Sequence, residues 1–322
     1  MAKLPAYLIV LTTLSFASIH CASTSTKTGH SIMKNKQGHS ISVANLDCCD
    51  DFKQQVITLD SLREVIILVH GCKASSGHFI TLREVFEARG QQAICFSYNY
   101  RTSIESCARQ LVLAINVVEK ILNPPGITIV AHSQGGLVAR RALSYPRQDR
   151  LALNTASPKV RLVTISSPFN GINASSHCGI NPLHVASAGM TLLVCQLIAG
   201  STWSEIHPKS DFINNPGSLY NLISTHIKIN TDEENTCRRV SENGACLEND
   251  FVFSLGEQYN DIVDGDDRVV NIELKAGHAQ IVGGRGRPPF KLIEVLEEHR
   301  VLQSRTYLSL DKETALFHVL YR

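Results

Sequence analysis

The sequence lacks the features that mark several large classes of protein. Its 31 Lys and Arg residues nearly balance 29 Asp and Glu residues, and no basic cluster is interleaved with aromatic residues. A nucleic-acid-binding surface is therefore not expected. No His, Cys and Asp residues have the spacing of a zinc site, and no glycine-rich turn between a strand and a helix indicates a nucleotide. We expect no metal, no cofactor and no nucleic-acid partner.

Long hydrophobic runs are also missing. The apolar stretch near the N-terminus, from Tyr7 to Phe16, is too short to span a bilayer. Lys3 precedes it and small residues follow it, which is the arrangement of a secretory signal peptide. We therefore expect a signal peptide over residues 1–23, with cleavage after Ala17 or Ser23, and a secreted or periplasmic protein.

Ten cysteines are consistent with export to an oxidising compartment. Only one disulfide can be predicted from local sequence. Cys237 and Cys246 flank a segment whose Asn243-Gly244 pair is typical of a tight turn. A small hairpin closed by a disulfide is therefore expected there.

Apolar strand patterns alternate with helical patterns along the first half of the chain. The continuous apolar run VIILV is typical of a strand that is buried on both faces of a parallel sheet. Such alternation predicts βαβ units and a mainly parallel sheet with helices on both faces, in the α/β class. The main expected strands are residues 65–69, 93–98, 127–130, 160–165, 251–255 and 269–274, and the main helices are residues 79–89, 108–122 and 290–302.

The segment ITIVAHSQGG, residues 127–136, is the most informative part of the sequence. A β-branched strand pattern stops at His132-Ser133-Gln134 and changes at once to the helical pattern LVARRAL. This predicts a sharp strand-turn-helix in which Ser133 is exposed at the turn as a nucleophile, and in which Ala131 and Gly135 must be small.

These residues resemble the α/β-hydrolase superfamily and, within it, the secreted lipases and esterases. The resemblance extends from about Val65 to His278. It includes the sequence HGC after the first buried strand and SSPFNG after the strand of residues 160–165. It implies an α/β-hydrolase fold, a mainly parallel sheet with an inserted lid or cap.

The same resemblance implies a catalytic triad in the chain order serine, acid, histidine. His278 fits the base, because it follows a strand in the turn KAGHAQI. The segment EQYNDIVDGDD offers four aspartates as the acid, and Asp261 is the preferred one. The alternatives Asp264, Asp266 and Asp267 remain open.

The tetrahedral intermediate of acyl transfer needs two backbone N–H groups directed at its oxyanion. One should come from Gln134, directly after the nucleophile. The resemblance of HGC to the HG-x motif of lipases implies that the other comes from Cys72, as a backbone donor and not as a thiol.

We expect one hydrolase domain over residues 24–322, with a lid or cap inserted at about residues 173–249. The apolar stretch ASAGMTLLVCQLIA, residues 186–199, is either a buried core helix or the apolar face of this lid. The lid is the preferred interpretation, because an apolar lid can exclude water or make transient contact with a lipid surface.

The sequence thus predicts a secreted serine hydrolase that cleaves carboxylic esters, plausibly lipid esters, through an acyl-enzyme formed on Ser133. Its partner would be a small-molecule or lipid ester. An acyltransferase or an amidase could use the same groups. The alternative from another class is a catalytically silent hydrolase fold that acts as a lipid-binding or adhesion module.

Overall fold

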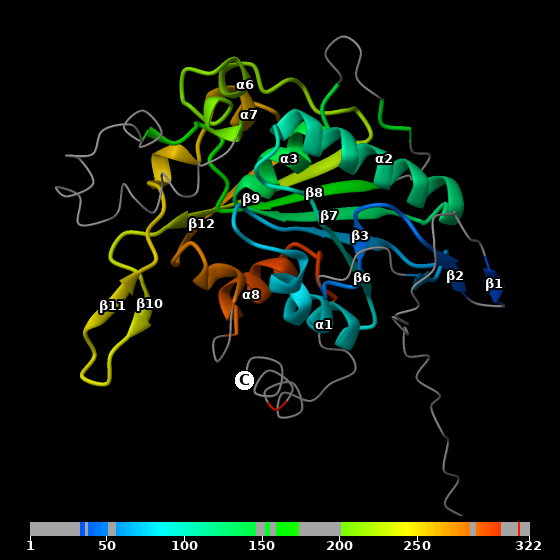
Figure 1. The fold of residues 1–322 in the computed structure, drawn as a ribbon, viewed down its shortest axis with the longest axis horizontal. Coiled ribbons are helices and arrows are strands. Elements are labelled where there is room, and N and C mark those ends of the chain that lie inside the picture. Colours follow the sequence, from blue (N-terminus) through cyan, green and yellow to red (C-terminus); the bar gives the residue numbers. More distant parts are fainter. Residues whose placement is uncertain are drawn as a thin grey trace, which may run out of the picture.

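A seven-stranded sheet forms the centre of the molecule (Figure 1). The computed structural model describes residues 33–35, 38–50, 56–145, 152–154, 159–173, 201–283, 288–303 and 315. The strand order is β12-β9-β8-β7-β5-β6-β3, and every neighbouring pair is parallel except β3 with β6. The strands are β3 (Leu46–Asp47), β5 (Val65–Val69), β6 (Gln92–Phe96), β7 (Ile127–His132), β8 (Val160–Ile165), β9 (Ile223–Asp232) and β12 (Val269–Lys275).

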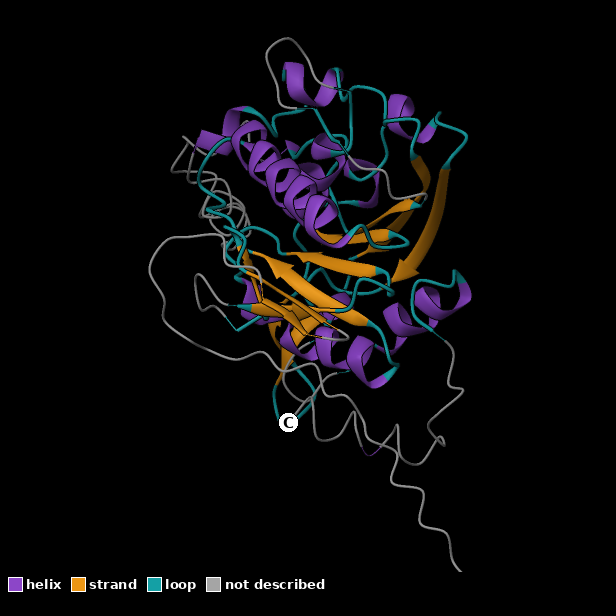
Figure 2. Ribbon diagram, turned by 90° about the vertical axis from the view of Figure 1, so that its right-hand side faces the viewer, coloured by secondary structure: helices purple, strands orange, loops and turns teal. Residues whose placement is uncertain are grey.

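Helices cover both faces of this sheet, as Figure 2 shows edge-on. Helices α2 (Ile104–Leu122) and α3 (Gln134–Ala142) lie on one face, and α1 (Ile80–Ala88) and α8 (Phe290–Glu298) lie on the other (Figure 1). All five residues of β5 are buried, and successive side chains pack into the apolar cores on opposite faces of the sheet. Ile67 packs with the α2 and α3 side, whereas Ile66 and Leu68 pack with the α1 and α8 side. A continuous apolar run is therefore required in this strand.

Local sequence signals set the ends of the longest helix. The side chain of Ser103 accepts a hydrogen bond from the backbone N–H of Ser106 at the start of α2. Asn123 ends the helix in a left-handed conformation, and Pro124 follows it. The predicted start at residue 108 was therefore one turn late, whereas the predicted end was correct.

Smaller elements surround the sheet. Strands β1 (Met33–Asn35), β2 (Gly38–Ile41) and β4 (Ile57–Leu59) form a separate antiparallel sheet. Strands β10 (Cys237–Val240) and β11 (Cys246–Asn249) form a hairpin that projects from the body (Figure 1). The short helices are η1 (Ser76–Phe79), η3 (Ser201–Ser204), α6 (Asp211–Asn214), η4 (Leu255–Glu257), α7 (Asp261–Asp264) and η5 (Gln280–Val282).

Two predicted boundaries were wrong. The expected cap of residues 173–249 contains β9, which pairs with β8 and β12 inside the central sheet. The expected strand at residues 251–255 does not form, because the backbone N–H groups of Val252 and Phe253 donate to the carboxylate of Glu233 and Leu255 begins the short helix η4. The predicted disulfide between Cys237 and Cys246 is confirmed, and a second one joins Cys49 to Cys95 in β6.

The predicted signal peptide of residues 1–23 and the apolar stretch of residues 186–199 lie outside the described residues. Among the helices of the described segments, none combines the length and the apolarity that crossing a bilayer requires.

Candidate active site

Ser133 occupies a sharp turn between β7 and α3. Its φ of 55° and ψ of −127° lie in a strained region for a residue with a side chain. The backbone is held there because the N–H of Ser133 donates to the carbonyl of Ile165 at 2.8 Å, and its own carbonyl accepts from Gly136 at 2.9 Å. The turn therefore has the geometry that the sequence predicted for a nucleophile.

Glycines are required around this turn because other chain segments pass very close to it. A Cβ atom on Gly135 would lie 2.7 Å from the carbonyl oxygen of Val69, and one on Gly136 would lie 2.8 Å from Cβ of Ser167. Neither distance is compatible with normal packing. The glycines let α3 pack directly onto the ends of β5 and β8.

A buried histidine and a buried carboxylate complete a line of hydrogen bonds from Ser133. The hydroxyl of Ser133 donates to Nε2 of His278 at 3.0 Å, and Nδ1 of His278 donates to Oε1 of Glu233 at 2.8 Å. The carboxylate partner determines the tautomer, with the proton on Nδ1 and the lone pair of Nε2 facing the serine. Ser133 is 7% exposed and His278 is 6% exposed.

Glu233 is held in place by further donors. Its Oε2 accepts from the backbone N–H groups of Val252 at 2.7 Å and Phe253 at 3.2 Å. Its Oε1 accepts from the hydroxyls of Ser166 at 2.7 Å and Thr231 at 3.1 Å. Burial raises the pKa of this carboxyl, but the charge of His278 and these hydrogen bonds outweigh burial and hold the pKa below its usual range. The group is therefore ionised at neutral pH.

A protein-family model described as "Putative serine esterase (DUF676)" matches residues 61–227. The chain belongs to this family. Among proteins with curated functions, no relative matches the sequence.

Solved structures of a bacterial lipase share the fold of this serine esterase family member. The mature form of the lipase BlEst2 from Bacillus licheniformis superposes with a TM-score of 0.51 at 15% identity, over 74% of this chain and 93% of that one. Its propeptide form superposes with a TM-score of 0.51 at 13% identity, over 77% of this chain and 52% of that one. An esterase from Thermogutta terrifontis superposes with a TM-score of 0.45 at 14% identity, over 86% of this chain and 97% of that one. The chain has the α/β-hydrolase fold that its motifs predicted.

The structure does not place Asp261 beside His278, so that prediction was wrong about the geometry of the acid. Asp261 is the first residue of α7 and is exposed. The alternatives fail as well: Asp264 pairs with Lys228 and Asp266 with Arg268, and Asp267 is exposed. Glu233 occupies the position beside the histidine instead.

The sheet order explains why Glu233 meets His278 in this esterase family member. Strands β9 and β12 are parallel neighbours, and Asp232 at the end of β9 is in register with Lys275 at the end of β12. Glu233 and His278 follow directly from these two strand ends. A usable sequence signal exists, since Ile223, Ile227 and Ile229 alternate toward Glu233. A strand buried on both faces of a parallel sheet is usually a continuous apolar run, so the polar His226 and Lys228 argued against a central strand here.

His132, which precedes Ser133, supports the backbone of His278. Its Nε2 donates to the backbone carbonyl of His278 at 2.9 Å, and the two rings lie 4.8 Å apart. Burial, together with the charge of His278, lowers the pKa of His132 well below its usual range. His132 is therefore neutral and fixes the backbone of the His278 turn.

The two predicted oxyanion donors lie beside Ser133. Gln134 is the first residue of α3, where backbone N–H groups have no partner within the helix. Cys72 lines the same cavity as Ser133. The turn before Cys72 is anchored by His70, whose ring stacks on Tyr98 at 4.4 Å and whose carbonyl accepts from the Tyr98 hydroxyl at 2.8 Å.

A cavity of about 210 Å³ opens at the serine. Apolar side chains of Phe79, Val252 and Val282 line part of its wall. Lys73 and Arg238 are the charged side chains among its described lining residues. Burial raises the pKa of the Cys72 thiol in this cavity to about 11, so that thiol is neutral at physiological pH and is not a competing nucleophile.

Proposed function

We propose that this protein is a carboxylic ester hydrolase that acts through an acyl-enzyme on Ser133. The observation that carries the proposal is the buried line of hydrogen bonds from Ser133 through His278 to Glu233. Membership of the serine esterase family supports it independently.

The geometry supports a complete sequence of proton transfers. Ser133 Oγ attacks the ester carbonyl while Nε2 of His278 takes its proton, and the ionised Glu233 stabilises the resulting imidazolium. The backbone N–H groups of Cys72 and Gln134 would bind the oxyanion. His278 then protonates the departing alcohol, and a water molecule releases the acid by the reverse transfers.

A lipid or other apolar ester is the proposed substrate class. The support is the apolar part of the cavity wall at Phe79, Val252 and Val282, since apolar walls bind an acyl chain through the hydrophobic effect. Export from the cytoplasm belongs to the same proposal, and the Cys49–Cys95 and Cys237–Cys246 disulfides are typical of such proteins.

A fluorophosphonate probe tests the chemistry. The wild-type protein should form a covalent adduct located by mass spectrometry at Ser133, and the folded Ser133→Ala variant should form none. Absence of an adduct on the folded wild-type protein would instead support a catalytically silent binding module.

Substrate class is tested separately with p-nitrophenyl esters of increasing acyl length. A lipid-directed enzyme should show a kcat/KM that rises from acetyl to longer chains. A preference for acetyl esters would refute the lipid part of the proposal and leave the ester hydrolase part intact.

A further inference from the structure

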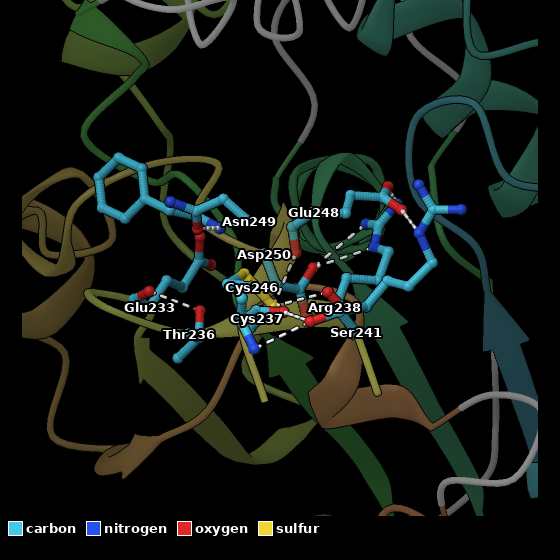
Figure 3. Close-up of a disulfide and its surroundings, with 12 residues drawn as sticks. Glu233, Thr236, Cys237, Arg238, Ser241, Cys246, Glu248, Asn249 and Asp250 are labelled. Carbon is cyan, nitrogen blue, oxygen red and sulfur yellow. Dashed lines mark hydrogen bonds and ion pairs between the residues drawn. A yellow bond between two sulfur atoms is a disulfide. The ribbon is translucent and has the colours of Figure 1, made fainter. Parts of the chain in front are cut away.

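The β10–β11 hairpin connects the two segments that hold the acid and the base of the proposed triad. Its first strand starts four residues after Glu233, and Asp250 follows its second strand directly. At its base, Thr236 donates through its hydroxyl to the carbonyl of Glu233 at 2.6 Å and accepts from the N–H of Asp250 at 3.2 Å. The Cys237–Cys246 disulfide closes the hairpin beside these contacts (Figure 3).

Asp250 binds three consecutive backbone N–H groups of the histidine turn. Its carbonyl accepts from His278 at 2.9 Å. Its carboxylate accepts from Ala279 at 3.1 Å and from Gln280 at 2.9 Å. The fit is close, because a Cβ atom on Gly277 would lie 2.7 Å from Cγ of Asp250. The histidine turn is therefore attached to one residue, whose backbone carbonyl holds His278 and whose buried carboxylate holds the two residues that follow it.

Arg238 provides the charge that a buried carboxylate needs. Its Nε lies 3.2 Å from Oδ1 of Asp250, and its Nη1 lies 3.4 Å from Glu248 (Figure 3). The Asp250 side chain is fully buried, whereas that of Arg238 is 44% exposed and lines the cavity at Ser133. A buried carboxylate without such donors would be costly.

We propose that Asp250 is a positioning residue that sets the place of His278 between Ser133 and Glu233, and that Arg238 on the disulfide-closed hairpin maintains it in that role. The proposal rests on the proposed function of Ser133. Asp250 touches neither the substrate nor the reacting atoms, so it acts only through the histidine turn. Small displacements of a catalytic group have large effects on the rate.

The substitution Asp250→Asn tests this arrangement with little change in shape. An amide oxygen cannot replace both carboxylate oxygens as acceptors. We expect kcat for a p-nitrophenyl ester to fall by about 10- to 100-fold with KM within about twofold. The far-downfield proton NMR resonance of the His278–Glu233 hydrogen bond should shift or broaden.

The matched control is Asp232→Asn. Asp232 is a carboxylate next to Glu233 in sequence, and its side chain pairs with the exposed Lys275 at the end of β12, three residues before His278. We expect its kcat and its downfield resonance to equal those of the wild type. A folded Asp250→Asn variant that behaves like this control would overturn the proposal.

If Asp250→Asn does not fold, two variants of Arg238 test the same arrangement: Arg238→Gln and Arg238→Lys. The Gln variant should lower kcat and disturb the resonance, and the Lys variant, which keeps the charge, should restore most of both. An increase in KM alone in Arg238→Gln, with the resonance unchanged, would mean that Arg238 binds substrate, and would overturn the proposal. Because the resonance is measured without substrate, an inactive wild-type protein would refute the proposed function without deciding this test.

Discussion

At the scale of single residues, Glu233 lies among a dense set of hydrogen-bond donors. Its carboxylate accepts from two backbone N–H groups, from two hydroxyls and from His278. An ionised, immobile carboxylate beside a histidine both orients the ring and stabilises its protonated form. Ser166, with its positive φ of 45°, is part of this environment because its hydroxyl contacts both Glu233 and His278.

Glu233→Gln should therefore remove most of the activity. An amide keeps the shape but cannot stabilise the imidazolium, so we expect kcat to fall on the order of a thousandfold. Steady-state hydrolysis of a p-nitrophenyl ester measures this. Asp261→Asn is the control and should leave kcat unchanged. If the losses were reversed between the two variants, Asp261 would be the acid after all.

At the scale of elements, the turn from β7 into α3 depends on close approach between segments. Gly135 lies against the carbonyl oxygens of Val69 and His70 at the end of β5. The strained backbone of Ser133 persists because hydrogen bonds on both sides of the residue fix it. The position and the backbone strain of Ser133 are thus properties of the β5-β7-α3 unit and not of the serine alone.

Gly135→Ala should destabilise this unit and reduce activity. A methyl group has no space there, and relief requires a backbone shift that we expect to cost about 1–3 kcal/mol in the free energy of unfolding. Urea denaturation and kcat give the two readouts. Gly256→Ala in η4 is the control, since nothing lies within 4 Å of its added Cβ atom. Equal effects in the two variants would contradict the packing argument.

At the scale of the whole molecule, stability comes from two apolar layers on either side of the sheet. Buried polar groups interrupt them near β9. His226 is fully buried and its ring contacts the Thr164 hydroxyl at 3.0 Å. Burial, with smaller effects from Arg140 and Lys228, lowers the pKa of His226 well below its usual range. The folded protein therefore holds this histidine neutral.

This buried histidine makes the stability of the fold depend on pH. Its folded pKa lies below the unfolded value near 6.5, so the unfolded chain binds more protons as pH falls below that value. Stability should fall by about 1.4 kcal/mol per pH unit for such a histidine. Urea unfolding at pH 7.5 and at pH 5.5 measures the loss, and His226→Gln should show a smaller one. An unchanged difference between the two pH values would exclude His226 as the cause.

The two described disulfides should differ in their contribution to stability. Cys49–Cys95 spans 46 residues, whereas Cys237–Cys246 spans 9. Loop-closure entropy then gives about 4 kcal/mol for the first and about 3 kcal/mol for the second. Urea denaturation of the paired Cys→Ser variants tests the order. A larger loss from the short hairpin would show that its contacts, and not chain entropy, dominate.

The prediction of the acid failed for a physical reason that applies beyond this residue. Asp261 and Glu233 are both acidic residues that follow strand-like or turn-like segments, and nothing local distinguishes their roles. The expected strand at residues 251–255 directed the choice to Asp261, whereas the real strand, β9, had been assigned to the cap. Once β9 is a central strand, its end lies beside the end of β12.

Local sequence was sufficient to predict the alternating strands and helices, the sharp turn at Ser133, the histidine turn and the hairpin disulfide. These features depend on residues close together in the chain, where periodicity and turn chemistry act directly. The carboxylate that meets His278 and the contacts of Asp250 with the histidine turn depend instead on how the whole chain folds. Glu233 and His278 are 45 positions apart, and Asp250 is 28 to 30 positions from the residues that it binds in the histidine turn. The order of strands in the sheet brings these residues together, and no local pattern encodes that order.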